Sequence, residues 1–205
     1  MSKLVVVVGA TGVQGGSVVD AFLKDPNYKI RGLTRKPDGD AGLALAAKGV
    51  DVVAADLNDE ASLVKAFNGA YAIFAVTNFF EPLGATGSVT AAQEIEWTQA
   101  TNMVKAARQI PSLQHYIWST LPNSTKITGG KFPVPFMDTK AKVDGYIRED
   151  KEFAKKTTFF YLTFYASNLL LPNFLPIHVV SSSRSSTNFE LIIWTRSLTT
   201  AWFCF

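Results

Sequence analysis

The chain has 205 residues, 47% of them hydrophobic and 18% charged, which predicts a folded domain and not a disordered chain. Its formal net charge of +3 is small and evenly spread, which argues against direct binding of nucleic acid. A single cysteine, Cys204, cannot form a disulfide within the chain, and the two histidines lack metal-ligand spacing. The apolar run at residues 4–8 is too short for a secretory signal or a membrane span. We expect a soluble cytoplasmic protein without metal or membrane, and the nucleus stays open as a second location.

Strand-type and helix-type patterns alternate along the chain, which is typical of a parallel sheet covered by helices on both faces. The expected strands are residues 4–8, 29–34, 51–55, 70–76, 114–119 and 157–164. Six strands joined by crossovers predict an α/β fold, a doubly wound Rossmann sheet with the order 3-2-1-4-5-6.

Four helices are expected between these strands. The first begins near Val13 and the third covers residues 92–109. The second is expected to follow a cap at Asn58 or Asp59, and the fourth a cap at Asp138 or Thr139. The apolar side chains expected to face the sheet are Val18, Val19, Phe22, Leu23, Leu63, Val64, Phe67, Val143, Tyr146 and Ile147.

Glycines recur every third residue directly between the first strand and the first helix, at Gly9, Gly12 and Gly15. The first permits a tight turn, the second lets the backbone approach a pyrophosphate, and the third lets helix and strand pack closely. Backbone N–H groups at the helix start then face the phosphates. The spacing predicts a dinucleotide site, and the alternative is a turn needed only for chain reversal. The residues assigned to this turn are Gly9, Ala10, Thr11, Gly12, Val13, Gln14 and Gly15.

The end of the second strand distinguishes the two nicotinamide dinucleotides. NAD sites usually carry an acidic residue there, whereas this chain has Arg35 and Lys36 and no carboxylate before Asp38. A guanidinium suits the 2′-phosphate of NADP(H), so the sequence favours NADP(H). The alternative is that both cations belong to a solvated loop edge.

Ligands of open α/β sheets bind at the carboxyl ends of the strands. Asp56 and Leu57 follow the third strand, and Thr77, Asn78 and Phe79 follow the fourth. Taken alone, the pattern leaves open whether these five residues contact a cofactor.

Several segments together resemble the NmrA-like family of atypical short-chain dehydrogenases, over about residues 3–176. They are residues 9–18, 34–37, 69–78, 118–119 and 136–143. The chain is most similar to the redox-sensing members and less to the plant isoflavone-reductase branch.

The resemblance implies NADP(H) binding by the glycine turn, Arg35, Lys36 and the two later strand ends. It also implies cofactor-binding roles for Lys140 and for Tyr165 and Asn168. Known members include transcriptional co-regulators that bind protein partners according to NADP(H) status, and others are oxidoreductases.

The chain departs from ordinary short-chain dehydrogenases at their catalytic tyrosine. That tyrosine lies four residues before a lysine, and here Phe136 occupies the position before Lys140. Lys140 is expected to bind the nicotinamide ribose or to act in proton transfer, and the alternative is an ordinary surface lysine in the first helical turn. Ser119 is either a substrate-positioning serine or a strand-end cap. Phe136 is either a pocket wall or core.

The family normally continues into a smaller domain that closes over the nicotinamide, and here the resemblance fades near Pro176. Residues 181–186 are low in complexity, and no glycine follows Gly145. We therefore expect an NADP(H)-binding domain at 1–172 and an irregular or truncated tail at 173–205. Three functions follow: a redox-sensing regulator acting through a protein partner, an NADPH-dependent oxidoreductase, or a truncated product with little activity.

Overall fold

The computed structural model describes residues 2–162, 165 and 168 of the chain. The chain divides into two compact units, residues 1–164 and residues 165–205, and the sheet and helices described below belong to the first. Residues 173–205, the predicted tail, lie outside the described residues.

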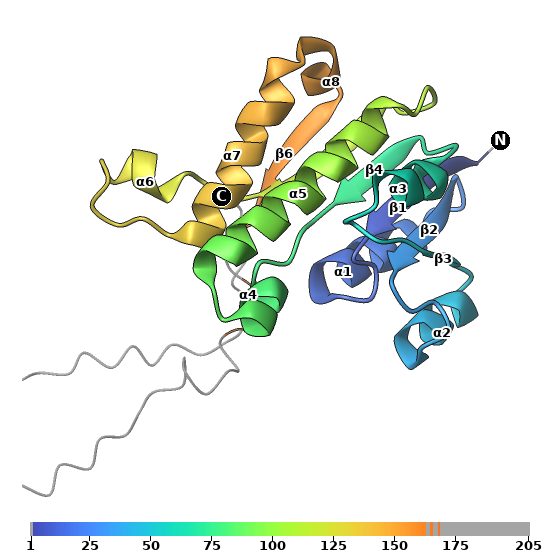
Figure 1. The fold of residues 1–205 in the computed structure, drawn as a ribbon. Coiled ribbons are helices and arrows are strands. Elements are labelled where there is room, and N and C mark those ends of the chain that lie inside the picture. Colours follow the sequence, from blue (N-terminus) through green and yellow to red (C-terminus); the bar gives the residue numbers. More distant parts are fainter. Residues whose placement is uncertain (1, 163–164, 166–167, 169–205) are drawn as a thin grey trace, which may run out of the picture. The chain divides into compact units, whose positions relative to one another are not determined.

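Six parallel strands form one sheet in the order β3-β2-β1-β4-β5-β6, which confirms the predicted doubly wound topology (Figure 1). The strands are β1 Lys3–Val8, β2 Tyr28–Thr34, β3 Asp51–Ala54, β4 Ala72–Ala75, β5 His115–Thr120 and β6 Thr157–Tyr161. Chain order reverses at β1, which pairs with β2 on one side and with β4 on the other. Such a reversal opens a crevice at the carboxyl ends of the two central strands, where ligands of this fold class bind.

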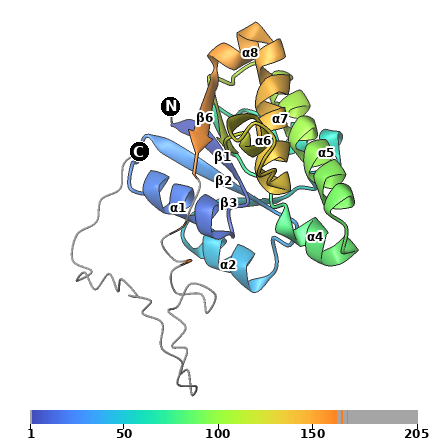
Figure 2. The same ribbon diagram turned by 90° about the vertical axis from the view of Figure 1, so that its left-hand side faces the viewer.

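Helices cover both faces of the sheet, as Figures 1 and 2 show. They are α1 Val13–Phe22, α2 Asp40–Ala47, α3 Glu60–Phe67, α4 Phe80–Thr86, α5 Val89–Arg108, α6 Ser124–Ile127, α7 Pro135–Glu149 and α8 Lys151–Lys155. α1 and α2 lie on one face, and α3, α5 and α7 lie on the other (Figure 2).

Strand β1 separates two hydrophobic cores because its side chains alternate between the faces. Val5 and Val7 pack with α1 and α2, and Val6 and Val8 pack with α3, α5 and α7. All four valines are at most 3% exposed. A strand buried on both faces needs a continuous β-branched run, which is the pattern the sequence shows.

One of the two cap predictions was right and the other was wrong. Asp59 caps α3, since its carboxylate accepts hydrogen bonds from the N–H groups of Ala61 and Ser62. Neither Asp138 nor Thr139 caps α7, because this helix begins earlier, at Pro135, with Val134 as its cap residue. Proline is favoured at a first helical position because its missing N–H would be unpaired there anyway.

Leu23 does not face the sheet as expected. It lies just after the end of α1 and is 37% exposed. Within the described residues, no helix is both long and apolar enough to span a membrane.

Candidate functional site

The glycine turn joins β1 to α1 at the central carboxyl edge of the sheet. Gly9 has φ +65°, a left-handed conformation that glycine adopts without steric cost. The N–H of Gly12 donates to the carbonyl of Gly9 at 2.9 Å, which closes the turn. A Cβ at Gly15 would lie 2.2 Å from the Gly9 carbonyl oxygen, so only glycine fits there.

The start of α1 faces this edge without a capping side chain. Gly12 is the cap residue and makes no side-chain capping bond. Helix N-termini with exposed N–H groups and the positive end of the helix dipole favour anions. A Cβ at Gly9 would lie 3.3 Å from Cγ1 of Val76, so the turn packs against the segment that leaves β4.

Gln14 connects the first turn of α1 to β5. Its Nε2 donates to Oγ of Ser119 at 2.7 Å. Ser119 is 5% exposed and is the second-last residue of β5. The structure thus brings two predicted site residues together, and the substrate-positioning role of Ser119 stays a prediction.

Lys140 lies in a buried cluster between α7, α5 and the end of β4. Its Nζ donates to the Thr77 carbonyl at 3.0 Å, to Thr77 Oγ1 at 2.6 Å and to Glu96 Oε1 at 2.7 Å. Thr77 Oγ1 in turn donates to the same Glu96 oxygen at 2.7 Å. Lys140 is 9% exposed, so the alternative of an ordinary surface lysine is wrong.

Burial and an ion pair act against each other on the Lys140 ammonium. Burial lowers the pKa of Lys140 below its usual value, and the Glu96 carboxylate opposes this shift. The other Glu96 oxygen, Oε2, is buried and makes no hydrogen bond to the described residues. A buried carboxylate oxygen without a donor is costly, which marks this cluster as a place to seek a ligand.

Sequence reasoning missed Glu96. The signal was present, because Ala92, Glu96 and Ala100 repeat every fourth residue on one face of α5 and all three are buried. A charged residue between two small apolar ones on a buried helix face requires a partner across the interface. That partner, Lys140, is 44 residues away in sequence.

One turn further along α7, Asp144 occupies a second buried position. Its carboxylate accepts from Nε1 of Trp118 at 3.0 Å and from the hydroxyl of Tyr161 at 2.9 Å. Burial raises the pKa of Asp144, and these hydrogen bonds oppose that shift. The bonds tie α7 to β5 and β6, and they hold the helix that carries Lys140 against the sheet.

Phe136 takes the position of the missing tyrosine and is surrounded by aromatic rings. Its ring centroid lies 6.1 Å from that of Phe79 and 5.3 Å from that of Phe80. Phe79 is 4% exposed, whereas Phe80 is 61% exposed. Phe136 lies one turn before Lys140 on α7 and has no hydroxyl group to transfer a proton. Its role as a pocket wall stays a prediction.

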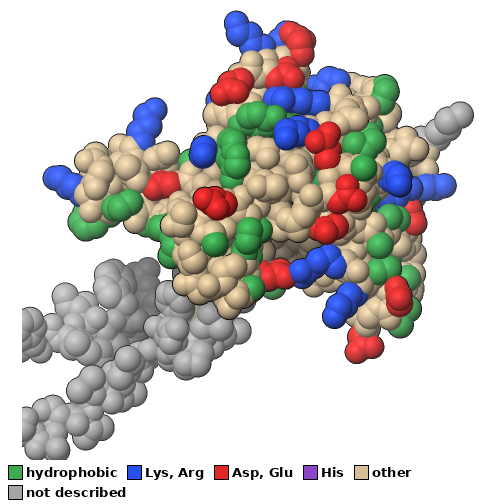
Figure 3. Space-filling view, viewed as in Figure 1, with side chains coloured by type: hydrophobic (Ala, Val, Ile, Leu, Met, Phe, Trp, Pro, Cys, Tyr) green, Lys and Arg blue, Asp and Glu red, His purple; other side chains and the backbone are tan. Residues whose placement is uncertain are grey.

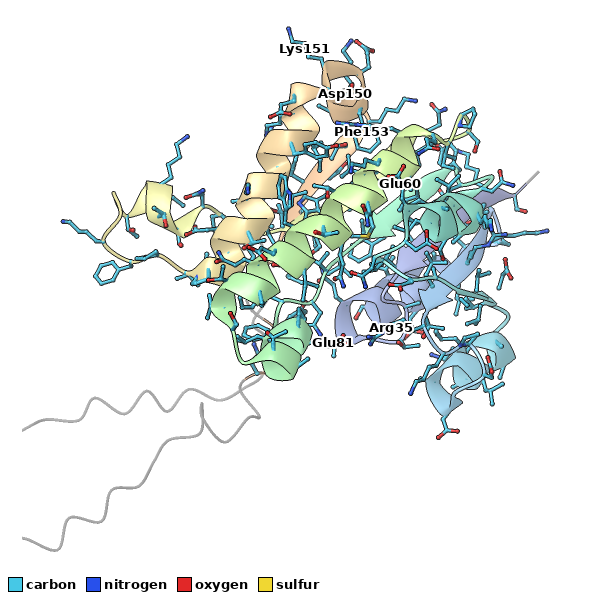
Figure 4. The ribbon with its side chains drawn as sticks, in the orientation of Figure 1. Arg35, Glu60, Glu81, Asp150, Lys151 and Phe153 are labelled. Atoms are coloured by element: carbon cyan, nitrogen blue, oxygen red, sulfur yellow. The ribbon has the colours of Figure 1, made fainter. Side chains whose placement is uncertain are left out.

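Arg35, the residue expected to bind the 2′-phosphate, forms an ion pair with Glu81 of α4. Figure 4 shows the two side chains approaching each other between the end of β2 and α4. Both side chains are largely exposed, at 70% and 49%. Neighbouring Lys36 is also exposed, and its N–H donates to Thr34 Oγ1 at 3.3 Å. Sequence reasoning missed Glu81 as a partner of Arg35.

The remaining strand-end residues make local bonds. Asp56 Oδ1 accepts from the backbone N–H and the side-chain amide of Asn58, both at 2.9 Å. The Leu57 carbonyl accepts from the Asn102 side chain at 3.1 Å, and the Leu57 side chain packs against the core. Asn78 Oδ1 accepts from the N–H of Phe80 at 3.1 Å. Cofactor contacts for Asp56, Leu57 and Asn78 stay predictions.

Tyr165 and Asn168 belong to the second unit of the chain, where the N–H of Asn168 donates to the Tyr165 carbonyl at 2.9 Å. Their predicted cofactor roles stay predictions. Within the part of the chain that the structure describes, no group of three or more His, Cys, Asp or Glu residues could hold a metal ion. On the face drawn in Figure 3, basic and acidic side chains are interspersed.

Comparison with solved structures supports the fold. NmrA, described as a negative transcriptional regulator, matches with a TM-score of 0.67 and 24% identity, over 82% of this chain and 48% of NmrA. NmrA has also been solved in complex with NAD and in complex with NADP. The triphenylmethane reductase of Citrobacter sp. matches with a TM-score of 0.61 and 25% identity, over 80% of this chain and 50% of the reductase. It has been solved in complex with NADP(H).

Comparison of sequences identifies the family. An NmrA-like family domain-containing oxidoreductase of Aspergillus hancockii, hkm9, is 33% identical over 180 residues, which are 86% of this chain and 50% of hkm9. The chain spans about half the length of the curated relatives it matches. The model of the NmrA-like family matches residues 1–191. The chain therefore belongs to the NmrA-like family.

Proposed function

We propose that residues 1–172 form an NADP(H)-binding domain whose cofactor lies along the carboxyl edge of β2, β1 and β4. One observation carries this proposal: a Cβ at Gly15 would lie 2.2 Å from the Gly9 carbonyl oxygen. α1 thus begins so close to β1 that its first turn faces the edge, as a pyrophosphate site requires. The complexes of NmrA with NAD and NADP support the proposal.

The residues at the edge fit the two ends of the cofactor. Arg35 follows β2, where the adenosine ribose binds in this fold class, and its guanidinium suits a 2′-phosphate. Lys140 and Thr77 lie beyond β4, on the nicotinamide side, with the unpartnered Glu96 oxygen among them. In this arrangement Lys140 would exchange one of its three bonds to Thr77 and Glu96 for a bond to the nicotinamide ribose, and Phe136 would line the wall beside it.

The cofactor proposal is tested by calorimetry of NADP⁺, NADPH and NAD⁺ with the purified 205-residue chain. We expect binding of both phosphorylated forms, with weaker binding of NAD⁺. An absence of heat with all three nucleotides at millimolar concentration would remove the proposal and leave the fold alone.

The chain's more specific role is that of a redox-sensing regulator, in which a protein partner reads the cofactor's state. Two observations support it. Phe136 replaces the phenol that would protonate a substrate, and Lys140 Nζ is already bonded to Thr77 and Glu96. The description of NmrA as a transcriptional regulator is consistent with this role. Regulation through a partner requires that cofactor binding shift the population of a surface conformation.

The second candidate is an NADPH-dependent oxidoreductase. The names of hkm9 and of triphenylmethane reductase favour it, and Lys140, with its lowered pKa, offers a proton donor. NADPH consumption at 340 nm with a panel of carbonyl compounds, quinones and triphenylmethane dyes distinguishes the two candidates. Sustained consumption would overturn the regulator proposal, and its absence in a chain that binds NADPH would support that proposal.

Thermal unfolding gives a second test of the cofactor proposal. We expect a single cooperative transition that moves to higher temperature with NADP(H), because a folded binding site is stabilised by its ligand. A transition that NADP(H) does not move would contradict the proposal.

A further inference from the structure

The guanidinium of Arg35, on which the proposed preference for NADP(H) depends, forms an ion pair with Glu81. The Arg35–Glu81 pair joins the loop after β2 to α4, across 46 residues of sequence. Because both side chains are largely exposed, the pair is screened by water and is easily broken. An arriving anion can therefore compete with the Glu81 carboxylate for Arg35.

The α4 segment holds Glu81 in place at this edge. Phe79 and Pro82, which flank Glu81 closely, are both buried. The N–H of Phe80 is bonded to the Asn78 side chain, and the left-handed Gly87 ends the helix. The carboxylate is thus carried by an anchored backbone, whereas Arg35 has a long flexible side chain that can change its partner.

Resting on the proposed function, we propose that Glu81 is a specificity-determining residue that competes with the cofactor's 2′-phosphate for Arg35. NADP(H) must displace the carboxylate to bind the guanidinium, whereas NAD(H) lacks the 2′-phosphate and leaves the pair intact. Glu81 consequently weakens NADP(H) binding selectively and brings the affinities of the two dinucleotides closer together.

The substitution Glu81→Gln removes the charge and keeps the shape of the side chain. Glu152→Gln is a matched control, because Glu152 is also an exposed acid in the first turn of a short helix and pairs with Lys155 at 2.7 Å. α8, which carries Glu152, directly precedes β6. It therefore lies at the amino ends of the strands, away from the carboxyl ends where the cofactor is proposed to bind (Figure 1). Both variants lose the same favourable charge at a helix start, so they share any general effect on stability.

The affinities of NADP⁺ and NAD⁺ are measured by calorimetry for the wild-type chain and both variants, at low and high ionic strength. We expect Glu81→Gln to tighten NADP⁺ binding by roughly two- to fivefold, the range of an exposed ion pair, and to leave NAD⁺ binding unchanged. The gain should shrink at high salt, and Glu152→Gln should change neither affinity. Where NAD⁺ binds too weakly to measure, the NADP⁺ affinity relative to Glu152→Gln decides.

An unchanged NADP⁺ affinity, or an equal change for both nucleotides, would overturn the inference. A weaker NADP⁺ affinity would also overturn it, because Glu81 would then orient Arg35 for the phosphate. The double variant Arg35→Ala/Glu81→Gln tests whether Glu81 acts through Arg35. Its NADP⁺ affinity should equal that of Arg35→Ala, because without Arg35 the carboxylate has no guanidinium to compete for. A wild-type chain that binds neither nucleotide refutes the proposed function itself, whereas binding without a selective effect of Glu81→Gln refutes only this inference.

Discussion

The ammonium of Lys140 lies 2.7 Å from Oε1 of Glu96, and the two side chains are only 11% and 1% exposed. The pair joins α7 to α5, and Thr77 Oγ1 bonds to both members and connects them to the end of β4. A charge at this depth is tolerated only with its partner, because low-polarity surroundings penalise a single ion strongly. The pair therefore couples the stability of the domain to the residue proposed to hold the cofactor.

Removing Glu96 alone should be strongly destabilising. Glu96→Ala leaves the Lys140 ammonium buried without a counter-charge, which costs about 3–5 kcal/mol of unfolding free energy. The double variant Glu96→Leu/Lys140→Met should recover much of that loss, because no charge then remains buried. Urea unfolding measures both. Glu60→Gln, which weakens an exposed bond to Gln109, is the control with a small effect. A double variant no more stable than Glu96→Ala would contradict this account.

Substitution of two glycines by alanine should change the stability of the domain in opposite directions. Gly15→Ala places a Cβ against the Gly9 carbonyl oxygen, so the β1–α1 turn must open. We expect a loss of at least roughly 2 kcal/mol of stability, as for other overpacked core sites, and a loss of NADP⁺ binding. Gly145 of α7 has no atom within 4 Å of a built Cβ. Gly145→Ala should therefore stabilise by up to about 1 kcal/mol.

Urea unfolding and NADP⁺ calorimetry on the two variants check this contrast. A Gly15→Ala variant with wild-type cofactor affinity would show that the close approach of α1 to β1 is not needed for binding. Equal effects of the two substitutions on stability would show that the close approach itself carries no strain.

The fold could be predicted from the sequence where the signal is local. Leu4 and the four valines that follow it are a buried-strand pattern, and the glycine spacing fixes the turn and the start of α1. The strand order then follows from the crossover rules of this fold class. These local signals placed β1, α1 and the glycine turn correctly.

Four helices were missed. α4, α6 and α8 have four to seven residues each, too few for a clear apolar period. α2 depends on tertiary packing: a Cβ at Gly42 would lie 2.2 Å from the Pro37 carbonyl, and Leu45 is buried against the sheet. Composition alone does not reveal such contacts.

The partners of the two predicted cations could not be predicted for the same reason. Glu81 and Glu96 come from helices far along the chain, and only the folded domain brings them to Arg35 and Lys140. Sequence spacing indicates which cation lies at a strand end, but the acid that meets it is set by how helices pack.

Asp138 should make the domain sensitive to acid. Burial alone would raise its pKa, but hydrogen bonds from Thr125 and Ser124 outweigh this and hold the pKa of Asp138 below its usual 3.8. The ionised carboxylate therefore stabilises the folded state above pH 3.8, and this contribution is lost as the pH falls through the lower, folded-state pKa.

The substitution Asp138→Asn removes the charge that receives these bonds. We expect a loss of about 1 kcal/mol at pH 7, the usual contribution of such hydrogen bonds, that fades under acid conditions. Urea unfolding of the wild type and the variant between neutral and acid pH measures the difference. A difference that stays constant with pH would show that the ionised form of Asp138 does not contribute.

Reversing the charge of Arg35 tests the adenosine end of the site. In Arg35→Glu, a carboxylate faces Glu81 and the proposed position of the 2′-phosphate, so repulsion replaces attraction. We expect the ratio of NADP⁺ to NAD⁺ affinity to fall by at least about tenfold, since a charge-assisted hydrogen bond contributes roughly 1.5–3 kcal/mol. Calorimetry with both nucleotides measures the ratio, and Arg148→Glu on α7 is a charge-matched control away from the strand ends. An unchanged ratio in Arg35→Glu would assign Arg35 to a solvated loop edge, and the preference for a phosphorylated ribose would then have to come from another cation.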